Sequence, residues 1–213
     1  MVEPAATGTA PSRRERRMAE TRAAILGAVR QLFDERGYAE TTIDDIAERA
    51  DIAPRTFFRY FPSKEAVLFA GADDIRVAML AALAVRPLEE EPLRSLLLAV
   101  DEVTELADSL RAELIWAFTL IRQHPDACPE PAAVKTRLTI EVATLLATRM
   151  GVDLDEDPRP SAWAGAVISC FGAAMRTMSR SDRPLREVYR ELVLTTGLGL
   201  AEVAAGWAPP GQP

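Results

Sequence analysis

Apolar residues recur at helical spacing along most of the chain. Between about residues 14 and 36 they follow the i, i+3, i+4, i+7, i+8 pattern that gives a helix one buried face. These positions are Ile25, Ala28, Val29, Leu32 and Phe33. Gly37 comes directly after the segment, where glycine commonly ends a helix. The pattern predicts a long first helix that ends at Arg36.

Two short helices are predicted next. Thr42 is a suitable N-cap, and Asp45, three residues later, can complete a capping box. A turn at Asp51 and Ile52 separates this helix from a second one, which begins near Pro54 and ends before Pro62. A long helix followed by two short helices with a tight turn between them is the helix-turn-helix arrangement. Its second short helix enters the DNA major groove.

The remaining two thirds of the chain also show helical patterns, separated by proline and glycine. Ser63 is expected to cap a helix that continues from Lys64 to about Val85. Further helices are predicted over residues 93–107, 110–123, 131–150, 161–179 and 184–205. The expected fold is all-α, with an N-terminal three-helix DNA-binding domain that contains the helix-turn-helix and a larger C-terminal helical domain.

Composition agrees with this fold class. The chain has 213 residues, of which 48% are apolar and 27% charged, and β-branched runs are scarce, as in helical proteins. The two cysteines, Cys128 and Cys170, provide no disulfide framework and fit a reducing cytoplasm. The sequence shows neither a long uncharged apolar window nor a secretory signal, so we expect a cytoplasmic protein without a membrane partner.

The net charge of −7 is distributed unevenly. Residues 1–64 contain 11 Lys and Arg against 10 Asp and Glu, whereas residues 65–213 contain 14 against 22. The N-terminal part includes a basic run formed by Arg13, Arg14, Arg16, Arg17 and Arg22. A small, locally cationic module joined to an acidic one is therefore expected. The run could follow DNA phosphates or enter the minor groove, or it could be a solvated tail.

The segment TTIDDIAERADIAPRTFFRYFPSKEAVL, residues 41–68, resembles the DNA-binding signature of the TetR family of bacterial transcriptional regulators. The resemblance covers roughly residues 20–70. It includes the Thr-aromatic-aromatic-x-Tyr-Phe helix and the Ser-Lys-Glu start of the following helix. Two positions depart from the family pattern. Asp51 replaces the usual turn glycine, and Phe58 replaces a common tyrosine whose hydroxyl would reach a phosphate.

The resemblance implies which residues contact DNA. Phe57 and Phe61 are four positions apart and should anchor the recognition helix in its own core. Arg55 is the best candidate for reading a guanine edge, because its guanidinium can bond O6 and N7 together. Tyr60 and Lys64 are expected at phosphates. The expected DNA-binding residues are Thr42, Pro54, Arg55, Thr56, Phe58, Tyr60 and Lys64. Alternatively, Arg55 and Arg59 are simply exposed and Tyr60 simply packs.

The domain organisation expected from these features has four parts. Residues 1–17 form a flexible basic arm, residues 18–64 the helix-turn-helix domain, residues 65–207 a helical domain that binds an effector and dimerises, and residues 208–213 a disordered tail. The dimer is expected to form through the last two helices, where small residues over 161–179 permit close approach. Packing within one chain is the alternative use of that small-residue face. Two-fold symmetry requires a roughly palindromic double-stranded operator.

The effector implied by the resemblance is a small, hydrophobic molecule of unknown identity. Its expected site lies between the central helices of the second domain, although apolar residues at helical spacing also form ordinary core. The candidate lining residues are Met79, Leu83, Trp116, Leu120, Arg122, Trp163, Phe171 and Met175. The expected function is a homodimeric repressor released from its operator by this effector. An activator of the same family remains an alternative.

Enzymatic chemistry has little support in the sequence. His124 is the only histidine, which excludes multi-histidine metal sites. Asp153 opens a string that resembles a calcium loop, but Pro158 stands where the required glycine should be. We therefore expect no catalytic residues, no metal and no cofactor. A helical ligand carrier or an enzyme without DNA binding is the alternative from another functional class.

Overall fold

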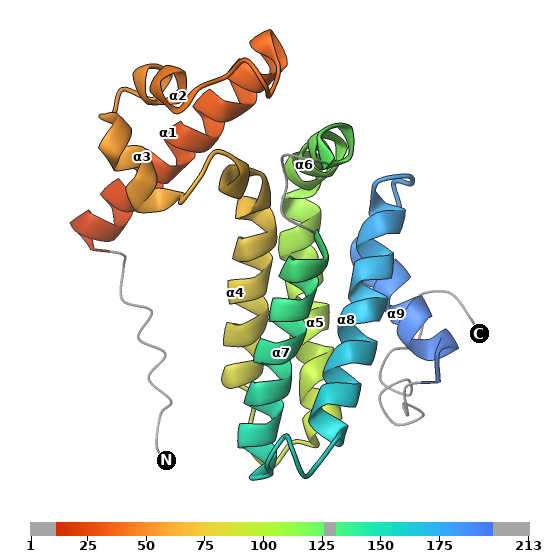
Figure 1. The fold of residues 1–213 in the computed structure, drawn as a ribbon. Coiled ribbons are helices and arrows are strands. Elements are labelled where there is room, and N and C mark those ends of the chain that lie inside the picture. Colours follow the sequence, from red (N-terminus) through yellow and green to blue (C-terminus); the bar gives the residue numbers. More distant parts are fainter. Residues whose placement is uncertain (1–11, 126–130, 198–213) are drawn as a thin grey trace, which may run out of the picture. The chain divides into compact units, whose positions relative to one another are not determined.

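The computed structural model describes residues 12–125 and 131–197. All regular elements in these ranges are helices (Figure 1), which confirms the all-α prediction. The chain divides after Leu68 into two compact units. The first contains α1 (Arg13–Arg36), α2 (Ile43–Arg49) and α3 (Pro54–Tyr60), and it ends within the 3-10 helix η1 (Glu65–Phe69).

Helix α1 begins at Arg13, which confirms the helix start predicted near residue 14 and places the helix within the expected flexible arm of residues 1–17. The Ser12 hydroxyl accepts from the Glu15 amide at 3.2 Å, and the Glu15 carboxylate accepts from the Ser12 amide at 2.7 Å. This capping box starts the helix at Arg13. Residues 13–17, expected to belong to a flexible arm, are therefore the first turns of α1. The predicted buried face is confirmed, because Ile25, Ala28, Val29, Leu32 and Phe33 are all buried.

The ends of the short helices agree with the sequence-based predictions. Thr42 and Asp45 form the expected reciprocal capping box at the start of α2. Asp51 adopts a left-handed conformation with φ 52°, which aspartate tolerates better than most residues. Pro54 occupies the first turn of α3. Phe61, which precedes Pro62, is extended and ends α3 after Tyr60.

The predicted single helix from Lys64 to Val85 is wrong. The chain instead forms η1 and then α4 (Ala70–Ala84), and Phe69 is both the last residue of η1 and the N-cap of α4. Ser63 still caps the first turn, since its hydroxyl accepts from the Ala66 amide at 3.3 Å. Burial of Val67 and Leu68 accompanies the tighter 3-10 turn. Tertiary packing has overridden an α-helical local preference here.

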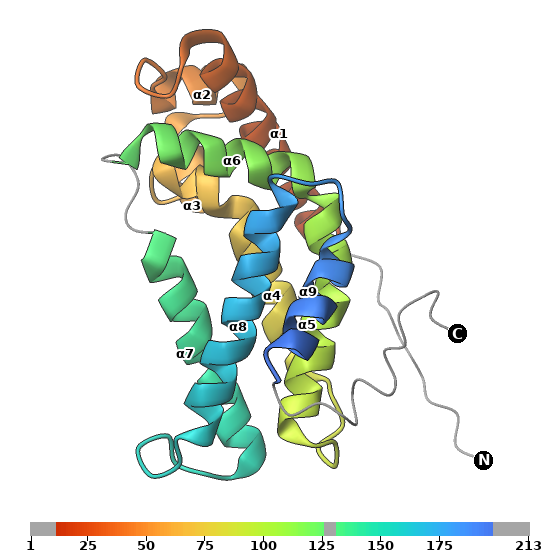
Figure 2. The same cartoon turned by 90° about the vertical axis from the view of Figure 1, so that its right-hand side faces the viewer.

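The second unit continues from α4 through five further labelled helices. They are α5 (Pro92–Ser109), α6 (Arg111–Gln123), α7 (Pro131–Met150), α8 (Arg159–Met178) and α9 (Leu185–Thr195). Helix α9 lies beside α5 and α8 in both views (Figures 1 and 2). It was predicted to continue to Ala205 but ends at Thr195, and Gly197 has a positive φ of 62°. Residues 198–205 lie outside the described ranges.

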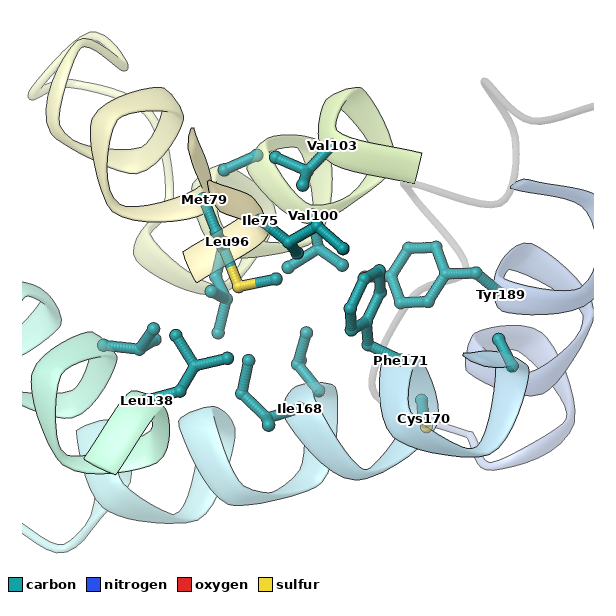
Figure 3. Close-up of a cluster of buried hydrophobic side chains, with 14 of the residues drawn as sticks. Ile75, Met79, Leu96, Val100, Val103, Leu138, Ile168, Cys170, Phe171 and Tyr189 are labelled. Atoms are coloured by element: carbon teal, nitrogen blue, oxygen red, sulfur yellow. The ribbon is translucent and has the colours of Figure 1, made fainter. Parts of the chain in front are cut away.

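One buried apolar cluster joins α4, α5, α7, α8 and α9, and Leu114 of α6 also belongs to it. In Figure 3 the rings of Phe171 and Tyr189 lie together, and Met79 lies near Leu96 and Ile75. The two rings pack edge to face, with centroids 6.4 Å apart. Burial raises the pKa of the Tyr189 hydroxyl well above its ordinary value. The last helix is thus part of the same core as the first helices of this unit.

The connection between α4 and α5 is held by a network around Glu90. Its carboxylate accepts from the Arg86 guanidinium at 2.7 Å through each oxygen, and from the Ser95 hydroxyl at 2.8 Å. Arg149 of α7 donates to the carbonyls of Arg86 and Pro87 at 2.9 and 2.7 Å. These bonds tie the connection to the first turn of α5 and to α7.

Glu90 should make stability depend on pH in the acid range. Hydrogen bonds from Arg86 lower the pKa of Glu90 from 4.5 to about 2. A depressed folded-state pKa stabilises the protein above the unfolded value, and this stabilisation is lost as pH falls. We expect Glu90→Gln to reduce the free energy of unfolding at pH 6, with the difference shrinking between pH 4.5 and about 2. Urea titrations across this range measure it. Glu89→Gln is the control, because Glu89 is exposed, and equal pH profiles for the two variants would contradict the role of Glu90.

Candidate nucleic-acid interface

Helix α3 is anchored on one side and exposed on the other. Phe57 is fully buried and Phe61 is 5% exposed, with their ring centroids 5.8 Å apart. This confirms the two predicted anchors. Arg55, Phe58 and Arg59 are exposed on the remaining circumference of the helix. A seven-residue helix is too short to be stable alone, so the two buried rings fix its orientation.

Arg55 is the side chain of α3 best placed to be available for a ligand. It is exposed and makes no hydrogen bond or ion pair with any residue that the structure describes. Pro54 beside it is exposed, and Thr56 is half-buried. The guanidinium therefore keeps its full set of donors, as bidentate recognition of a guanine requires.

Phe58 makes a packing contact with Phe57 that was not predicted from the sequence. Its ring meets the Phe57 ring edge-on, with a centroid distance of 5.7 Å and an interplanar angle of 87°. More than half of the side chain, 55%, is nevertheless exposed. Phe58 thus covers the buried anchor on one side and presents an apolar surface on the other.

Tyr60 lies where α3 meets α1. Hydrogen bonding to Thr21 of α1, and then to Arg59, lowers the pKa of the Tyr60 hydroxyl. The Arg59 guanidinium stands 5.1 Å from the centre of the Tyr60 ring and donates to its hydroxyl at 3.3 Å. Sequence reasoning missed Thr21, because a threonine in the first half of a long helix carries no local signal of a contact with α3.

Lys64 has an internal role in addition to the phosphate contact expected from its position. Its ammonium group donates to the carbonyls of Tyr38 and Thr41 at 2.7 and 2.8 Å. The nitrogen also lies 4.2 Å from the centre of the Tyr38 ring, within cation–π range. The Tyr38 hydroxyl in turn donates to Glu65 at 2.5 Å. These contacts connect the turn after α1 with the segment after α3, and one ammonium hydrogen remains for another acceptor.

Thr42 is similarly committed within the fold. Its hydroxyl donates to the Asp45 carboxylate at 2.6 Å and accepts from the Asp45 amide at 3.1 Å. Asp45 also pairs with Arg36 at the end of α1, at 3.1 Å. Hydrogen bonds to Thr42 are the largest cause of a lowered pKa at Asp45. The capping box therefore joins α2 to α1 as well as starting α2.

Removing the Lys64 ammonium should destabilise the first unit without any DNA present. We expect Lys64→Met to reduce the free energy of unfolding by about 2 kcal/mol, because two charge-assisted hydrogen bonds to backbone carbonyls disappear. Thermal denaturation of the full chain measures this. Arg55→Met is the matched control, since it removes one positive charge from an unpaired side chain and should leave stability unchanged. Equal melting temperatures for the two variants would show that Lys64 has no structural role.

Comparisons with known proteins support this interpretation of the first unit. The sequence profile of the bacterial regulatory proteins of the tetR family matches residues 25–70. The HTH-type transcriptional regulator TcmR of Streptomyces glaucescens is 34% identical over 180 residues, which cover 82% of this chain and 78% of TcmR. This chain belongs to the TetR family. It is a transcriptional regulator with a helix-turn-helix DNA-binding unit, and α3 is the second short helix of that unit.

Other relatives agree with membership of the TetR family. The HTH-type transcriptional regulator EthR of Mycobacterium tuberculosis is 44% identical over 69 residues, covering 32% of this chain and 31% of EthR. A solved tetR-family regulator from Streptomyces coelicolor is 23% identical, covers 89% of this chain and 84% of its own, and has a TM-score of 0.51. A putative TetR-family regulator from Mesorhizobium loti is 19% identical, with coverages of 87% and 97% and the same TM-score. The two solved structures share the TetR-family fold.

The residues predicted to line an effector site fall into two groups in the second unit. Met79, Leu83, Phe171 and Met175 belong to the buried cluster, and Trp163 packs against it. The other three lie on α6 and outside that cluster. Trp116 and Leu120 are half-buried, and Arg122 is exposed. The structure thus brings five of the eight residues together around one core.

The described residues contain neither a membrane-spanning helix nor a metal-binding cluster. No helix within the described ranges is long and apolar enough to cross a membrane. In the same part of the chain, histidine, cysteine, aspartate and glutamate side chains form no group that could hold a metal ion. Cys170 is a free, buried thiol, and Cys128 lies outside the described residues.

Proposed function

We propose that this TetR-family chain is a homodimeric repressor whose recognition helix reads its operator through Arg55. The exposed, unpaired guanidinium on a helix held by Phe57 and Phe61 is the observation that carries this proposal. The two buried rings fix the orientation of the helix and so the direction of Arg55. Its guanidinium has no hydrogen-bond or ion-pair partner among the described residues that would compete with DNA. Tyr60 and the remaining Lys64 hydrogen are then available to phosphates, which set the register of the helix in the groove.

The dimer is assigned to α8 and α9. Along α8, Ala162 is exposed in the single chain, and Ala166, Gly172 and Ala173 are half-buried. On α9, Leu194 is 42% exposed. Small residues allow two helices to approach closely, and two such helices from each subunit would form a four-helix bundle. A two-fold axis through that bundle places two recognition helices on the two halves of a palindromic site.

Release of the operator is attributed to a small hydrophobic effector bound among the central helices of the second unit. The apolar cluster around Met79 and Phe171 supports this assignment. The effector would favour a conformer whose recognition helices have the wrong spacing for DNA. Coupling of about 1–3 kcal/mol would weaken operator binding about 5–150-fold. Adding long-chain acyl thioesters to a protein–operator complex, and following its dissociation, tests this step.

A mobility-shift assay with DNA from the protein's own promoter region tests the function. We expect wild-type protein to bind specifically and Arg55→Ala to lose about 1–3 kcal/mol of discrimination at each half-site, or about 5–150-fold. Arg55→Lys is the matched variant, because it keeps the charge and loses the bidentate geometry. It should retain nonspecific affinity but lose base preference. Unchanged specificity in Arg55→Ala would exclude Arg55 as the reading residue.

A further inference from the structure

We propose that Arg14 and Arg17, on the first turns of α1, form a second phosphate-binding surface that continues the DNA interface beyond α3. This inference rests on the proposed function, because it assumes that α3 lies in the major groove. Arg14 and Arg17 lie outside the helix-turn-helix, and the partner we propose for them is the DNA backbone that flanks each half-site.

The arginines of the basic run that lie between residues 13 and 17 have fixed positions around the axis of α1. The Ser12–Glu15 capping box makes residues 13–17 helical, so each arginine projects from a defined side of α1. The Glu15 carboxylate accepts from the Ser12 amide, and backbone hydrogen bonding to Ser12 is the main cause of the lowered pKa of Glu15. Glu15 is therefore engaged by its own helix cap and makes no ion pair with the neighbouring arginines.

This part of α1 also lies against the end of the recognition helix. Thr21 hydrogen-bonds to Tyr60, and the Arg22 guanidinium lies 5.8 Å from the centre of the Phe61 ring. The side of α1 that carries Thr21 consequently faces the same region as Tyr60, the expected phosphate contact.

Helical geometry divides the arginine run between two sides of α1. At about 100° per residue, Arg17 and Arg14 lie within about 40° of the direction of Thr21, whereas Arg16 lies about 140° away. All three are exposed, and none makes an ion pair with a residue in the described ranges. Two unpaired guanidinium groups thus extend the surface of Tyr60, and Arg16 provides an internal comparison on the opposite side.

The chemistry of this surface fits phosphates. Unpaired arginines next to a helix that reads base edges meet the dense negative charge of the duplex backbone. From Thr21 to Arg14 the helix rises about 10 Å, the length of about three base pairs. With α1 running along the duplex, Arg14 and Arg17 would contact phosphates outside the segment contacted by α3 and contribute affinity without sequence preference.

Two single variants with the same charge change test the proposal. Operator affinity of the full chain is measured for wild type, Arg17→Gln and Arg16→Gln over a range of salt concentrations. For Arg17→Gln we expect the slope of log K against log salt to fall by about 0.9 for each phosphate that the side chain no longer neutralises, with unchanged base preference. For Arg16→Gln we expect the wild-type slope. Arg14→Gln combined with Arg17→Gln should double the effect.

A truncated operator gives a second measurement. Removing three flanking base pairs from each end should weaken binding of wild type and of Arg16→Gln, but not of the Arg14→Gln/Arg17→Gln double variant. The proposal is overturned if Arg17→Gln and Arg16→Gln have the same slope, or if the double variant loses as much affinity on truncation as wild type does. If wild-type protein still binds its operator specifically and Arg55→Ala still loses specificity, either result rejects the proposal for Arg14 and Arg17 but not the proposed function. Absence of specific binding by wild-type protein would reject the proposed function.

Discussion

Phe57→Ala is expected to unfold the first unit of this protein while leaving the second folded. Phe57 is completely buried, and its ring contacts those of Phe58 and Phe61. Truncating a buried phenylalanine to alanine costs about 3–5 kcal/mol through reduced transfer free energy and the cavity left behind. The first unit ends at Leu68, and so small a unit has little stability in reserve. The expected loss is therefore comparable with its whole stability.

Hydrogen exchange of the full chain measures this loss region by region. Amides of α1, α2 and α3 should lose protection in Phe57→Ala, while those of α5 and α8 keep it. Phe58→Ala is the matched control, since it removes the neighbouring aromatic ring from a side chain that is 55% exposed. We expect it to cost about 1 kcal/mol or less. Retained protection in α1–α3 of the Phe57 variant would show that Phe57 does not anchor the unit.

Asp101→Asn is expected to loosen the attachment of α9 to α5. Asp101 accepts from Arg190 Nε at 2.7 Å and from Arg190 Nη2 at 2.8 Å, and its side chain is only 10% exposed. An asparagine of the same shape can accept at one position only, so a largely buried guanidinium hydrogen loses its partner. Breaking a fully buried pair costs about 3–5 kcal/mol. Because Arg190 is 34% exposed, we expect about 2 kcal/mol.

Glu105 provides the control for Asp101. It accepts from Arg186 Nη1 at 2.6 Å on the same pair of helices, but its side chain is 73% exposed. Exposed pairs contribute about 0–1 kcal/mol, so Glu105→Gln should have little effect. Urea denaturation compares the two variants. Since we propose that α9 forms part of the dimer interface, sedimentation should also show weaker association for Asp101→Asn only. Similar stabilities of the two variants would contradict a structural role for the Asp101 pair.

The helix ends of the first unit could be predicted because each depends on a few adjacent residues. Thr42 and Asp45 form a capping box from three positions apart, and Pro62 forces Phe61 into an extended conformation. Asp51 adopts the left-handed conformation that the turn requires, and this depends on the residue type at that one position. The two anchors followed from the i, i+4 spacing of Phe57 and Phe61. None of these features needs a contact between distant parts of the chain.

Other features needed the tertiary structure because their partners are far apart in sequence. The carbonyls of Tyr38 and Thr41, which hold Lys64, lie 26 and 23 residues before it. The 3-10 turn of η1, where an α-helix was predicted, buries Val67 and Leu68. The Ser12–Glu15 capping box, by contrast, joins residues three positions apart and is a local signal. The expected arm over residues 1–17 overlapped the helix that the apolar pattern predicted from about residue 14, and the capping box decides between them in favour of the helix.

The sequence by itself determined the fold class, the order of the helices, the two aromatic anchors and the family. It could do so because helical periodicity, capping and turn chemistry are local properties, and the recognition motif is contiguous. Only the tertiary structure decided that Arg55 has no internal partner among the described residues, that Lys64 has two, and that Thr21 connects α1 to Tyr60. The charge and donors left for DNA depend on bonds made inside the fold, and those bonds form between side chains that folding alone brings together.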